Sequence, residues 1–144
     1  MVQAKFQRCP MIIQSGVIPY FIENDTVKYV LITSTRKPNR WIFPKGMLEP
    51  NMLAWESAVK EGIEEAGVYG EVSTDVCAHY QYKKWSSLCQ VDMYLLRVVD
   101  IAQYWEEAAL RRRRVCTYDE AFGLIFKRVK PALFAAQQQI QSCL

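Results

Sequence analysis

The order of hydrophobic and polar positions along the chain predicts a mixed α/β (α+β type) fold. Six apolar stretches read as strands, and turn residues at Asn24-Asp25 and Ser86-Ser87 separate two pairs of them. Helical spacing occurs in three further stretches, the first of which follows Asn51, a candidate cap. Strands on both sides of one helix, with more helices at the end, imply a mixed sheet covered on both faces. The predicted strands are 12–23, 26–35, 41–43, 71–84, 88–100 and 113–118, and the predicted helices are 52–66, 118–125 and 131–143.

Three glutamates lie close together in the last turns of the first predicted helix. Glu61, Glu64 and Glu65 are three and four positions apart, so they share one side of a helix, where like charges repel. Gly67 predicts the end of this helix, and the helix dipole disfavours negative charge near that end. At about 100° per residue, the acids fall beside the apolar sector, so we expect them to border the core without bulky side chains over them. The sector predicted to face the sheet comprises Trp55, Ala58, Val59, Gly62, Ile63 and Ala66.

Two interpretations of these acids are open from the residues themselves. In the first, they form an ordinary solvated helix face, and Lys60 pairs with Glu56 and Glu64 for about 0.3–0.5 kcal/mol each. In the second, a divalent cation such as Mg²⁺ or Mn²⁺ binds them, because hard ions prefer carboxylate oxygens. Sites for Mg²⁺ commonly combine carboxylates with substrate phosphates, so the second interpretation favours chemistry on a phosphate ester or anhydride.

Composition narrows the class of protein. The 144 residues are 51% hydrophobic and 23% charged, which is typical of one globular domain, and we expect residues 1–144 to form it. No apolar run approaches the roughly 20 residues of a membrane span, and the N-terminal segment lacks the pattern of a secretory signal. The single histidine, His79, excludes a metal centre made of several histidines from this chain. Scattered cysteines without CxxC spacing predict reduced thiols in a cytoplasmic protein, and these are Cys9, Cys77, Cys89, Cys116 and Cys143.

Positive charge is unevenly distributed, although the net charge is only +3. One group of bases lies on the loops around the short 41–43 strand, and a second forms the run 111–114. Either group could be a solvated surface, but bases close to acids favour an anionic ligand that the bases hold. Alternate residues of a strand point to opposite faces, so two of the run 111–114 can reach a ligand, and Arg112 is our candidate. The candidates in the first group are Arg36, Lys37, Arg40 and Lys45.

The segment from Gly46 to Val68 resembles the Nudix box, the glycine–loop–helix–loop signature of the Nudix hydrolase family. Residues 33–50 and the order of the later segments are similar to the branch that hydrolyses diphosphoinositol polyphosphates and diadenosine polyphosphates. The resemblance covers most of the chain and implies an α/β/α sandwich around a mixed sheet. The residues that occupy the expected places of the box are Gly46, Glu61, Glu64, Glu65, Gly67 and Val68.

Three positions depart from the box. Met52 and Lys60 stand where the family has a glutamate and an arginine that brace the loop against the helix, and lysine cannot reproduce a guanidinium fork. We expect an exchanged brace, in which Met52 packs apolarly and Lys60 keeps only a point charge. Gly62 replaces an apolar residue and should cost about 1 kcal/mol relative to alanine unless a neighbour packs closely against it.

The resemblance implies an enzyme, a Nudix pyrophosphohydrolase that uses Mg²⁺ or Mn²⁺ to hydrolyse a phosphoanhydride linkage. Glu61 and Glu65 would be the principal metal ligands, and the carbonyl oxygen of Gly46 would complete the shell. Glu64 would be a further ligand or a base. Where the inositol-type relatives have an acid before an aromatic residue, this chain has Arg114-Val115. Candidates for an assisting acid outside the box are Glu106, Glu107 and Asp92.

Two classes of substrate fit the resemblance. A diphosphoinositol polyphosphate needs many bases, whereas a diadenosine polyphosphate needs fewer bases and aromatic rings that clamp adenine. Met52 and Lys60 motivate an alternative function, a catalytically weak or inactive Nudix-fold module that binds a phosphorylated ligand. We expect no membrane partner, and a net charge of +3 without an RNA-binding motif argues against nucleic acid. The aromatics available for stacking are Tyr80, Tyr82 and Trp85.

Overall fold

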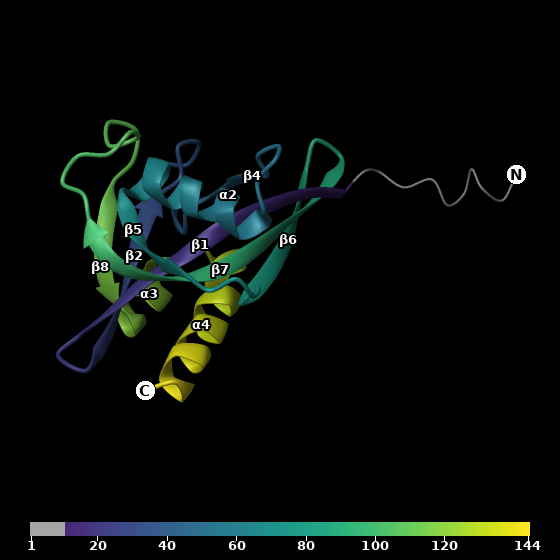
Figure 1. Ribbon diagram of the computed structural model, residues 1–144. Helices are drawn as coiled ribbons and strands as arrows, with labels where there is room; N and C mark the ends of the chain where they lie inside the picture. The colour runs from purple at the N-terminus through teal and green to yellow at the C-terminus, as the bar shows by residue number, and fades with distance from the viewer. Residues whose placement is uncertain (1–10) are drawn as a thin grey trace, which may run out of the picture.

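The computed structural model describes residues 11–144, which form a mixed sheet flanked by helices (Figure 1). The strands are β1 (Met11–Glu23), β2 (Thr26–Thr33), β3 (Trp41–Ile42), β4 (Lys45–Met47), β5 (Val68–Val72), β6 (Ala78–Lys84), β7 (Ser87–Ile101) and β8 (Arg113–Thr117). The helical elements are α2 (Ala54–Glu61), the π-helical turn η1 (Gly62–Ala66), α3 (Tyr118–Leu124), the short 3-10 turn η2 (Lys127–Val129) and α4 (Lys130–Ser142).

β1 is the central strand of the sheet. It pairs in parallel with β7 and antiparallel with β2 and β4. β2 also pairs with β3 and β8, and β7 also pairs with β5 and β6, all antiparallel. The sheet is therefore mixed, as the sequence predicts.

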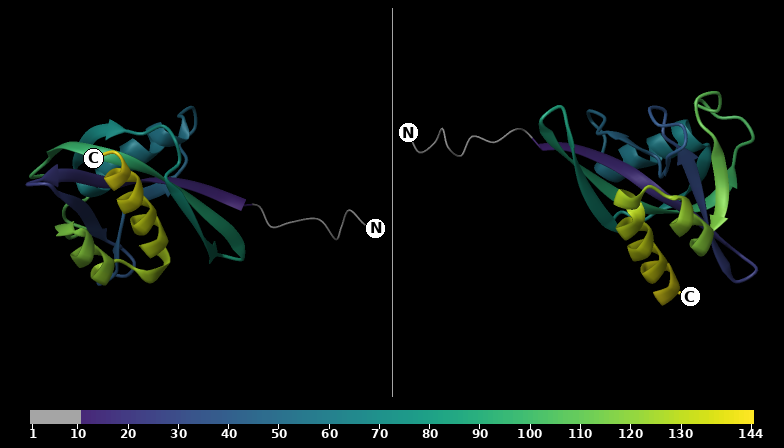
Figure 2. Two further views of the ribbon diagram at one scale, coloured as in Figure 1. Left: turned by 90° about the horizontal axis from the view of Figure 1, so that it is seen from below. Right: turned by 180° about the vertical axis from the view of Figure 1, so that it is seen from behind.

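Helices cover both faces of this sheet. α2 lies on one face, over a core cluster that contains Val17 and Val30, and α3 and α4 lie on the other, over Ile18 and Leu31 (Figures 1 and 2). Neighbouring residues of β1 and β2 enter different clusters because successive side chains of a strand point to opposite faces. This α/β/α arrangement confirms the expected fold class.

Two expectations from composition can be compared with residues 11–144. No helix in this part of the chain combines the length and the apolar composition that a bilayer crossing requires. Four cysteines are free thiols, as expected, and the fifth, Cys9, lies outside the described residues. The four are Cys77, Cys89, Cys116 and Cys143.

Two predicted features of the strands were wrong, and one strand was not predicted. The segment 71–84 is not one strand, because β5 ends at Val72, β6 begins at Ala78, and Ser73, Thr74 and Asp75 lie in the break between them. The three residues of β4 have no hydrophobic period, and they become a strand only through pairing with β1. The turn between β6 and β7 lies one residue earlier than predicted, at Trp85-Ser86, whose φ angles are 51° and 63°.

The predicted helix 52–66 begins later and ends irregularly. Leu53 is the N-cap, whereas Asn51, the expected cap, has a φ of 65° in the preceding turn. η1 continues α2 with the wider i→i+5 hydrogen bonding of a π-helix, which occurs frequently at functional sites. Gly67 ends the element in the left-handed conformation, as predicted. We call α2 and η1 together the box helix.

Candidate active site

The buried side of the box helix carries two of the three glutamates. Glu61 is 9% exposed and Glu65 is 6% exposed, so the expectation that they border the core is right, but they are not open to solvent. The loop after β4 covers this side: the amide of Glu49 donates to the Ser57 hydroxyl (3.2 Å), which donates to the Met47 carbonyl (3.4 Å). A helix wheel indicates which side of a helix faces the sheet and contains no information about a loop that covers another side. Of the residues predicted to face the sheet, Trp55 is half-buried and packs against the core cluster on this face, whereas Val59 and Ile63 are half-buried and lie outside that cluster.

Gly46 brings the backbone of β4 against the carboxyl group of Glu61. A Cβ at Gly46 would lie 2.3 Å from both Cδ and Oε1 of Glu61, so a side chain at this position would collide with the carboxyl group. Pairing with Ser15 of β1 holds Gly46 in place. A close approach of this kind explains the glycine at the start of the box.

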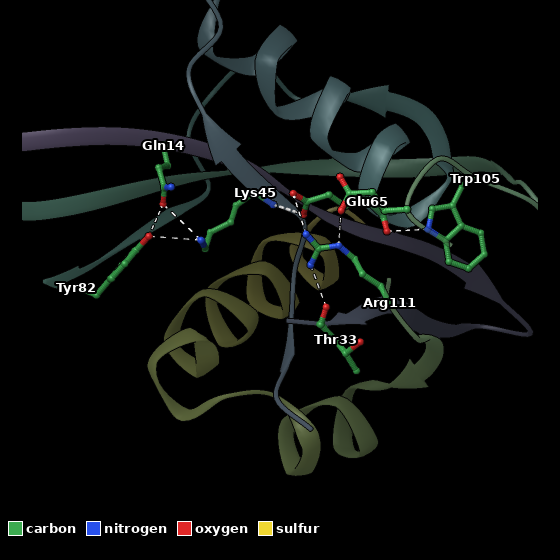
Figure 3. A network of polar contacts seen from close by, with 8 residues as sticks. Gln14, Thr33, Lys45, Glu65, Tyr82, Trp105 and Arg111 are labelled. Carbon is green, nitrogen blue, oxygen red and sulfur yellow. Dashed lines mark hydrogen bonds and ion pairs between the residues drawn. The ribbon is translucent and has the colours of Figure 1, made fainter. Parts of the chain in front are cut away.

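Glu61 and Glu65, here called the acid pair, are buried carboxyl groups whose negative charge is not fully balanced by positive charge nearby. Burial raises the pKa of Glu65 to about 8, while Arg111 acts in the opposite direction and a hydrogen bond to Glu61 raises it further. Burial also raises the pKa of Glu61. The Lys45 amide donates to Oε1 of Glu65 (3.1 Å), and Nη2 of Arg111 lies 3.4 Å from Oε2 (Figure 3). Buried carboxyl groups with raised pKa favour protonation or a nearby cation.

Glu64 does not join the acid pair. Its carboxylate forms an ion pair with Lys60, four residues earlier on the box helix. Within residues 11–144, no group of three or more histidine, cysteine, aspartate or glutamate side chains is placed to hold a metal ion. The arrangement therefore brings together Glu61, Glu65 and the backbone at Gly46, and it leaves Glu64 on the solvent side.

Lys60 links the loop to the helix, so the contact that Met52 and Lys60 were expected to change is kept through a different acid. Lys60 forms a second ion pair with Glu49 (3.1 Å), so an acid three residues before Met52 links the loop to the helix. The hydrogen bonds from Lys60, first to Glu64 and then to Glu49, raise the pKa of Lys60. Met52 is 42% exposed, so the prediction that it packs apolarly was wrong. At Gly62 an added Cβ would lie 2.9 Å from Cγ2 of Val17, which is the close packing that its place in a helix requires.

Arg111 is a candidate site residue that the sequence alone did not single out. Its side chain is 9% exposed and contacts three groups: Glu65, Oε1 of Glu107 (Nε donates, 2.8 Å) and the carbonyl of Thr33 (Nη1 donates, 3.0 Å) (Figure 3). β8 begins only at Arg113, so Arg111 belongs to the preceding loop and strand alternation does not apply to it. Arg111 supplies positive charge to the acid pair and shares that charge with Glu107.

Of the three candidate assisting acids, Glu107 is the one that interacts with the acid pair and with Arg111. Glu107 raises the pKa of Glu61 through its negative charge and holds Arg111. Glu106 is exposed, and Asp92 accepts a hydrogen bond from Gln90 of its own strand (3.0 Å).

A cavity of about 290 Å³, here called the basic cavity, lies beside the acid pair. Basic side chains from three parts of the chain line it, and among residues 11–144 no acidic residue does. All four bases predicted around the 41–43 strand are among them. The remaining three were not predicted, although the pair Lys83-Lys84 and the cluster 127–130 are basic runs in the sequence. The lining bases are Arg36, Lys37, Arg40, Lys45, Lys83, Lys84 and Arg128.

Lys45 connects the acid pair with the basic cavity. Its amide donates to Glu65, while its side chain lines the cavity and reaches Oε1 of Gln14 and the hydroxyl of Tyr82, each at 3.5 Å (Figure 3). Burial lowers the pKa of Lys45. One residue therefore spans the distance between the carboxylates and the bases.

Three of the aromatic rings at or near the cavity, those of Tyr82, Phe126 and Trp85, have cations over their faces, whereas Tyr80 lines the cavity without such a contact among the described residues. Arg40 lies 3.6 Å from the ring centroid of Phe126, and Arg128 lies 5.4 Å from that of Tyr82. Trp85, on the hairpin between β6 and β7, has Lys84 over its ring at 4.4 Å. These cation–π contacts occupy surfaces on which an adenine base would stack.

Arg112, the candidate from the run 111–114, does not line the basic cavity. It donates to the Pro38 carbonyl (2.8 Å) and lies 5.3 Å from the Trp41 ring centroid. It therefore holds the loop that carries Arg36, Lys37 and Arg40.

The donor set fits a hard divalent cation. Two buried carboxylates with raised pKa and a glycine backbone in contact with one of them provide oxygen atoms and need positive charge. Fold and site together define an α/β/α domain with an acid pair next to a basic cavity. The chain belongs to the Nudix family, because the NUDIX domain model matches residues 14–132. This family generally requires a divalent metal such as Mg²⁺ or Mn²⁺.

Curated relatives agree with the predicted branch. Nudix hydrolase 4 of Arabidopsis thaliana is 34% identical over 114 residues, which are 74% of this chain and 55% of that protein. Diphosphoinositol polyphosphate phosphohydrolase 3-beta of Bos taurus is 35% identical over 86 residues, 59% of this chain and 51% of that protein. The chain thus spans between about half and two thirds of the length of most of these relatives.

Solved structures show the same fold. An Ap4A hydrolase of C. elegans, in a binary complex, superposes with a TM-score of 0.76 at 20% identity and covers 91% of this chain and 98% of its own. The NUDIX domain of Shewanella oneidensis NrtR, complexed with ADP ribose, gives a TM-score of 0.75 at 9% identity and covers 94% of this chain and 92% of its own.

Proposed function

We propose that this protein is a Nudix pyrophosphohydrolase that hydrolyses a phosphoanhydride linkage in a polyphosphorylated small molecule with Mg²⁺ or Mn²⁺. The observation that carries the proposal is the acid pair beside a cavity that, within the described part of the chain, is lined by seven bases and no acid. Bases crowded in one cavity repel one another, and an anionic ligand with several phosphates relieves that repulsion. The names of the curated relatives, Nudix hydrolases and diphosphoinositol polyphosphate phosphohydrolases, support this chemistry.

In this proposal, Glu61, Glu65 and the carbonyl oxygen of Gly46 hold the cation. A bound divalent ion supplies positive charge for phosphate oxygens and lowers the pKa of water. Arg111 orients the Glu65 carboxylate, and Lys45 places a positive charge between the acid pair and the phosphates. Glu64 has a secondary role in this proposal, because its carboxylate is paired with Lys60. It acts on the cation through a solvent molecule or after release from Lys60.

Of the two substrate classes, we favour a crowded polyanion such as a diphosphoinositol polyphosphate over a diadenosine polyphosphate. Seven bases match many phosphates, and the rings of Tyr82, Phe126 and Trp85 already stack with cations. A cytoplasmic location is also part of the proposal and rests on the free thiols; relatives named mitochondrial exist in Arabidopsis thaliana.

A panel of substrates tests the activity. Phosphate release is measured from diphosphoinositol phosphates, diadenosine polyphosphates, ADP-ribose and nucleoside triphosphates, with Mg²⁺ or Mn²⁺ and with a chelator. We expect metal-dependent turnover that Glu65→Gln abolishes and that Glu23→Gln, at an exposed residue at the end of β1, leaves unchanged. Turnover that persists unchanged in Glu65→Gln contradicts the proposed ligands.

A matched pair of variants tests the cavity. Arg128 lines it, whereas the neighbouring Lys127 is exposed and does not. We expect Arg128→Ala to raise KM about tenfold, the loss of one charge-assisted contact, and Lys127→Ala to leave KM within about twofold. Equal effects of the two substitutions would show that general charge, and not the cavity, attracts the substrate.

The binding module is the second candidate function, because Glu64 is engaged by Lys60 and is not directed to the acid pair. It predicts that a diphosphoinositol phosphate raises the Tm of the protein while no substrate of the panel is turned over.

A further inference from the structure

The C-terminal end of the box helix is capped by a single distant segment. The last carbonyl groups of a helix have no partners within the helix and need external donors. Here the segment 102–113, which connects β7 to β8, provides donors to four consecutive carbonyl groups. They are the Glu107 amide to Glu64 O (3.1 Å), Trp105 Nε1 to Glu65 O (2.9 Å), Arg113 Nη1 to Ala66 O (2.8 Å) and the Ala102 amide to Gly67 O (2.8 Å).

Two of these donors are side chains that form one packed unit. The guanidinium carbon of Arg113 lies 3.9 Å from the ring centroid of Trp105. Both side chains press on Gly67, where an added Cβ would lie 2.7 Å from Cβ of Trp105 and 3.0 Å from Nη1 of Arg113. Arg113 begins β8 and pairs with Ile32 of β2, so this unit is anchored to the sheet. We call Trp105 and Arg113 the clamp.

The clamp acts on the turn that sets the geometry of the acid pair. η1 is π-helical, a rare and locally irregular form, and it contains Glu65 but not Glu61. Return of this turn to α-helical hydrogen bonding would rotate Glu65 relative to Glu61. Trp105 holds the carbonyl of Glu65, while the Lys45 amide and Arg111 hold its carboxylate (Figure 3).

We propose that Trp105 and Arg113 are positioning residues, which hold η1 in its π-helical form and thereby keep Glu65 directed toward Glu61 for cation binding. The inference rests on the proposed function of the acid pair. Neither residue lines the basic cavity. Loss of the clamp therefore weakens cation binding and lowers kcat, while KM for the phosphorylated substrate changes little.

Conservative substitutions test the clamp while keeping most of its bulk. Trp105→Phe keeps an aromatic ring and deletes the Nε1 donor together with part of the indole, and Arg113→Lys keeps the charge and deletes the planar group. Arg114→Lys is the matched control, because Arg114 is the next residue of β8 and donates none of the four hydrogen bonds to the carbonyl groups of residues 64–67. Urea midpoints of all variants show whether each one is folded.

The measured quantities are the Kd for Mn²⁺ alone, by titration calorimetry, and then kcat and KM at saturating Mn²⁺. We expect each clamp substitution to weaken Mn²⁺ binding about threefold to tenfold, as for the loss of one hydrogen bond, and to lower kcat more than it raises KM. In a chelator, amide exchange within residues 62–67 should be faster in both variants than in Arg114→Lys.

Two results overturn the inference and are distinguishable. If wild-type protein binds Mn²⁺ and both clamp variants bind it equally well, the clamp does not position the acid pair, and the proposed function stands. If wild-type protein itself binds no Mn²⁺, the proposed function fails and the positioning role fails with it.

Discussion

Burial of Glu65 makes the metal-free protein less stable as the pH rises, and Glu65→Gln should remove most of this effect. The ordinary pKa of the glutamate carboxyl is 4.5, and burial raises that of folded Glu65 to about 8. Between these values, the unfolded chain releases a proton that the folded protein retains. Each pH unit therefore lowers the free energy of unfolding by about 1.4 kcal/mol per proton. The contribution is fully present below the unfolded pKa and is lost as the pH rises toward the folded pKa.

The magnitude is large enough to measure by urea unfolding in a chelator. From about pH 5 to about pH 7.5 the wild-type protein should lose about 3 kcal/mol from this residue, with little reduction by solvent because Glu65 is 6% exposed. Glutamine resembles the protonated carboxyl in shape and cannot ionise, so Glu65→Gln should have a much shallower slope. Some slope should remain from Glu61, whose pKa burial also raises. The control Glu23→Gln should follow the wild type, and parallel curves for wild type and Glu65→Gln would refute this argument.

Further predictions concern the cation and the packing of the box helix. Gly46→Ala should weaken Mn²⁺ binding by at least tenfold in calorimetry, because its Cβ would lie 2.3 Å from the Glu61 carboxyl. Cation affinity should rise with pH up to about 8, roughly tenfold per pH unit for one displaced proton, since the raised pKa of Glu65 makes the cation compete with a proton; affinity that is independent of pH would contradict this. Gly62→Ala should lower the free energy of unfolding, measured with urea, by about 1 kcal/mol, because overpacking against Val17 exceeds the gain in helix propensity. An increase in the free energy of unfolding would contradict this and would mean that Val17 of β1 moves to make room for the methyl group.

The sequence predicted local features and missed those that depend on distant segments. Alternating patterns located β1 and β2, and the box spacing located the acid pair and the helix end at Gly67. The break between β5 and β6 has a local signal, the turn-forming residues 73–75, within the segment predicted as one strand. β4 and the π-helical form of η1 could not be predicted from their own residues, because the first exists through pairing with β1 and the second is held by the segment 102–113.

The candidate site residues divide in the same way into those that the sequence predicts and those that only the fold brings together. All four bases predicted around the short strand line the basic cavity, since their loop lies next to the box in sequence and in space. Arg111 and Arg128 come from segments far along the chain, so only the fold brings them to the site. Arg112 was predicted to contact the ligand, but it does not line the basic cavity. The prediction assumed strand alternation over 111–114, whereas β8 begins at Arg113 and Arg112 lies in the loop before it.

The substitutions in the box change which charges the site must balance. Lys60 takes Glu64 and Glu49 as partners at the surface of the helix, so only Glu61 and Glu65 are left buried. Their combined charge, when both are ionised, is −2, whereas Arg111 brings a single positive charge that it also shares with Glu107. Burial is the main cause of both raised pKa values, and the positive charge of Arg111 at Glu65 and of Lys60 at Glu61 offsets only part of it. A divalent cation balances such a pair, and for this reason the loss of the box glutamate and arginine is compatible with cation binding at the acid pair.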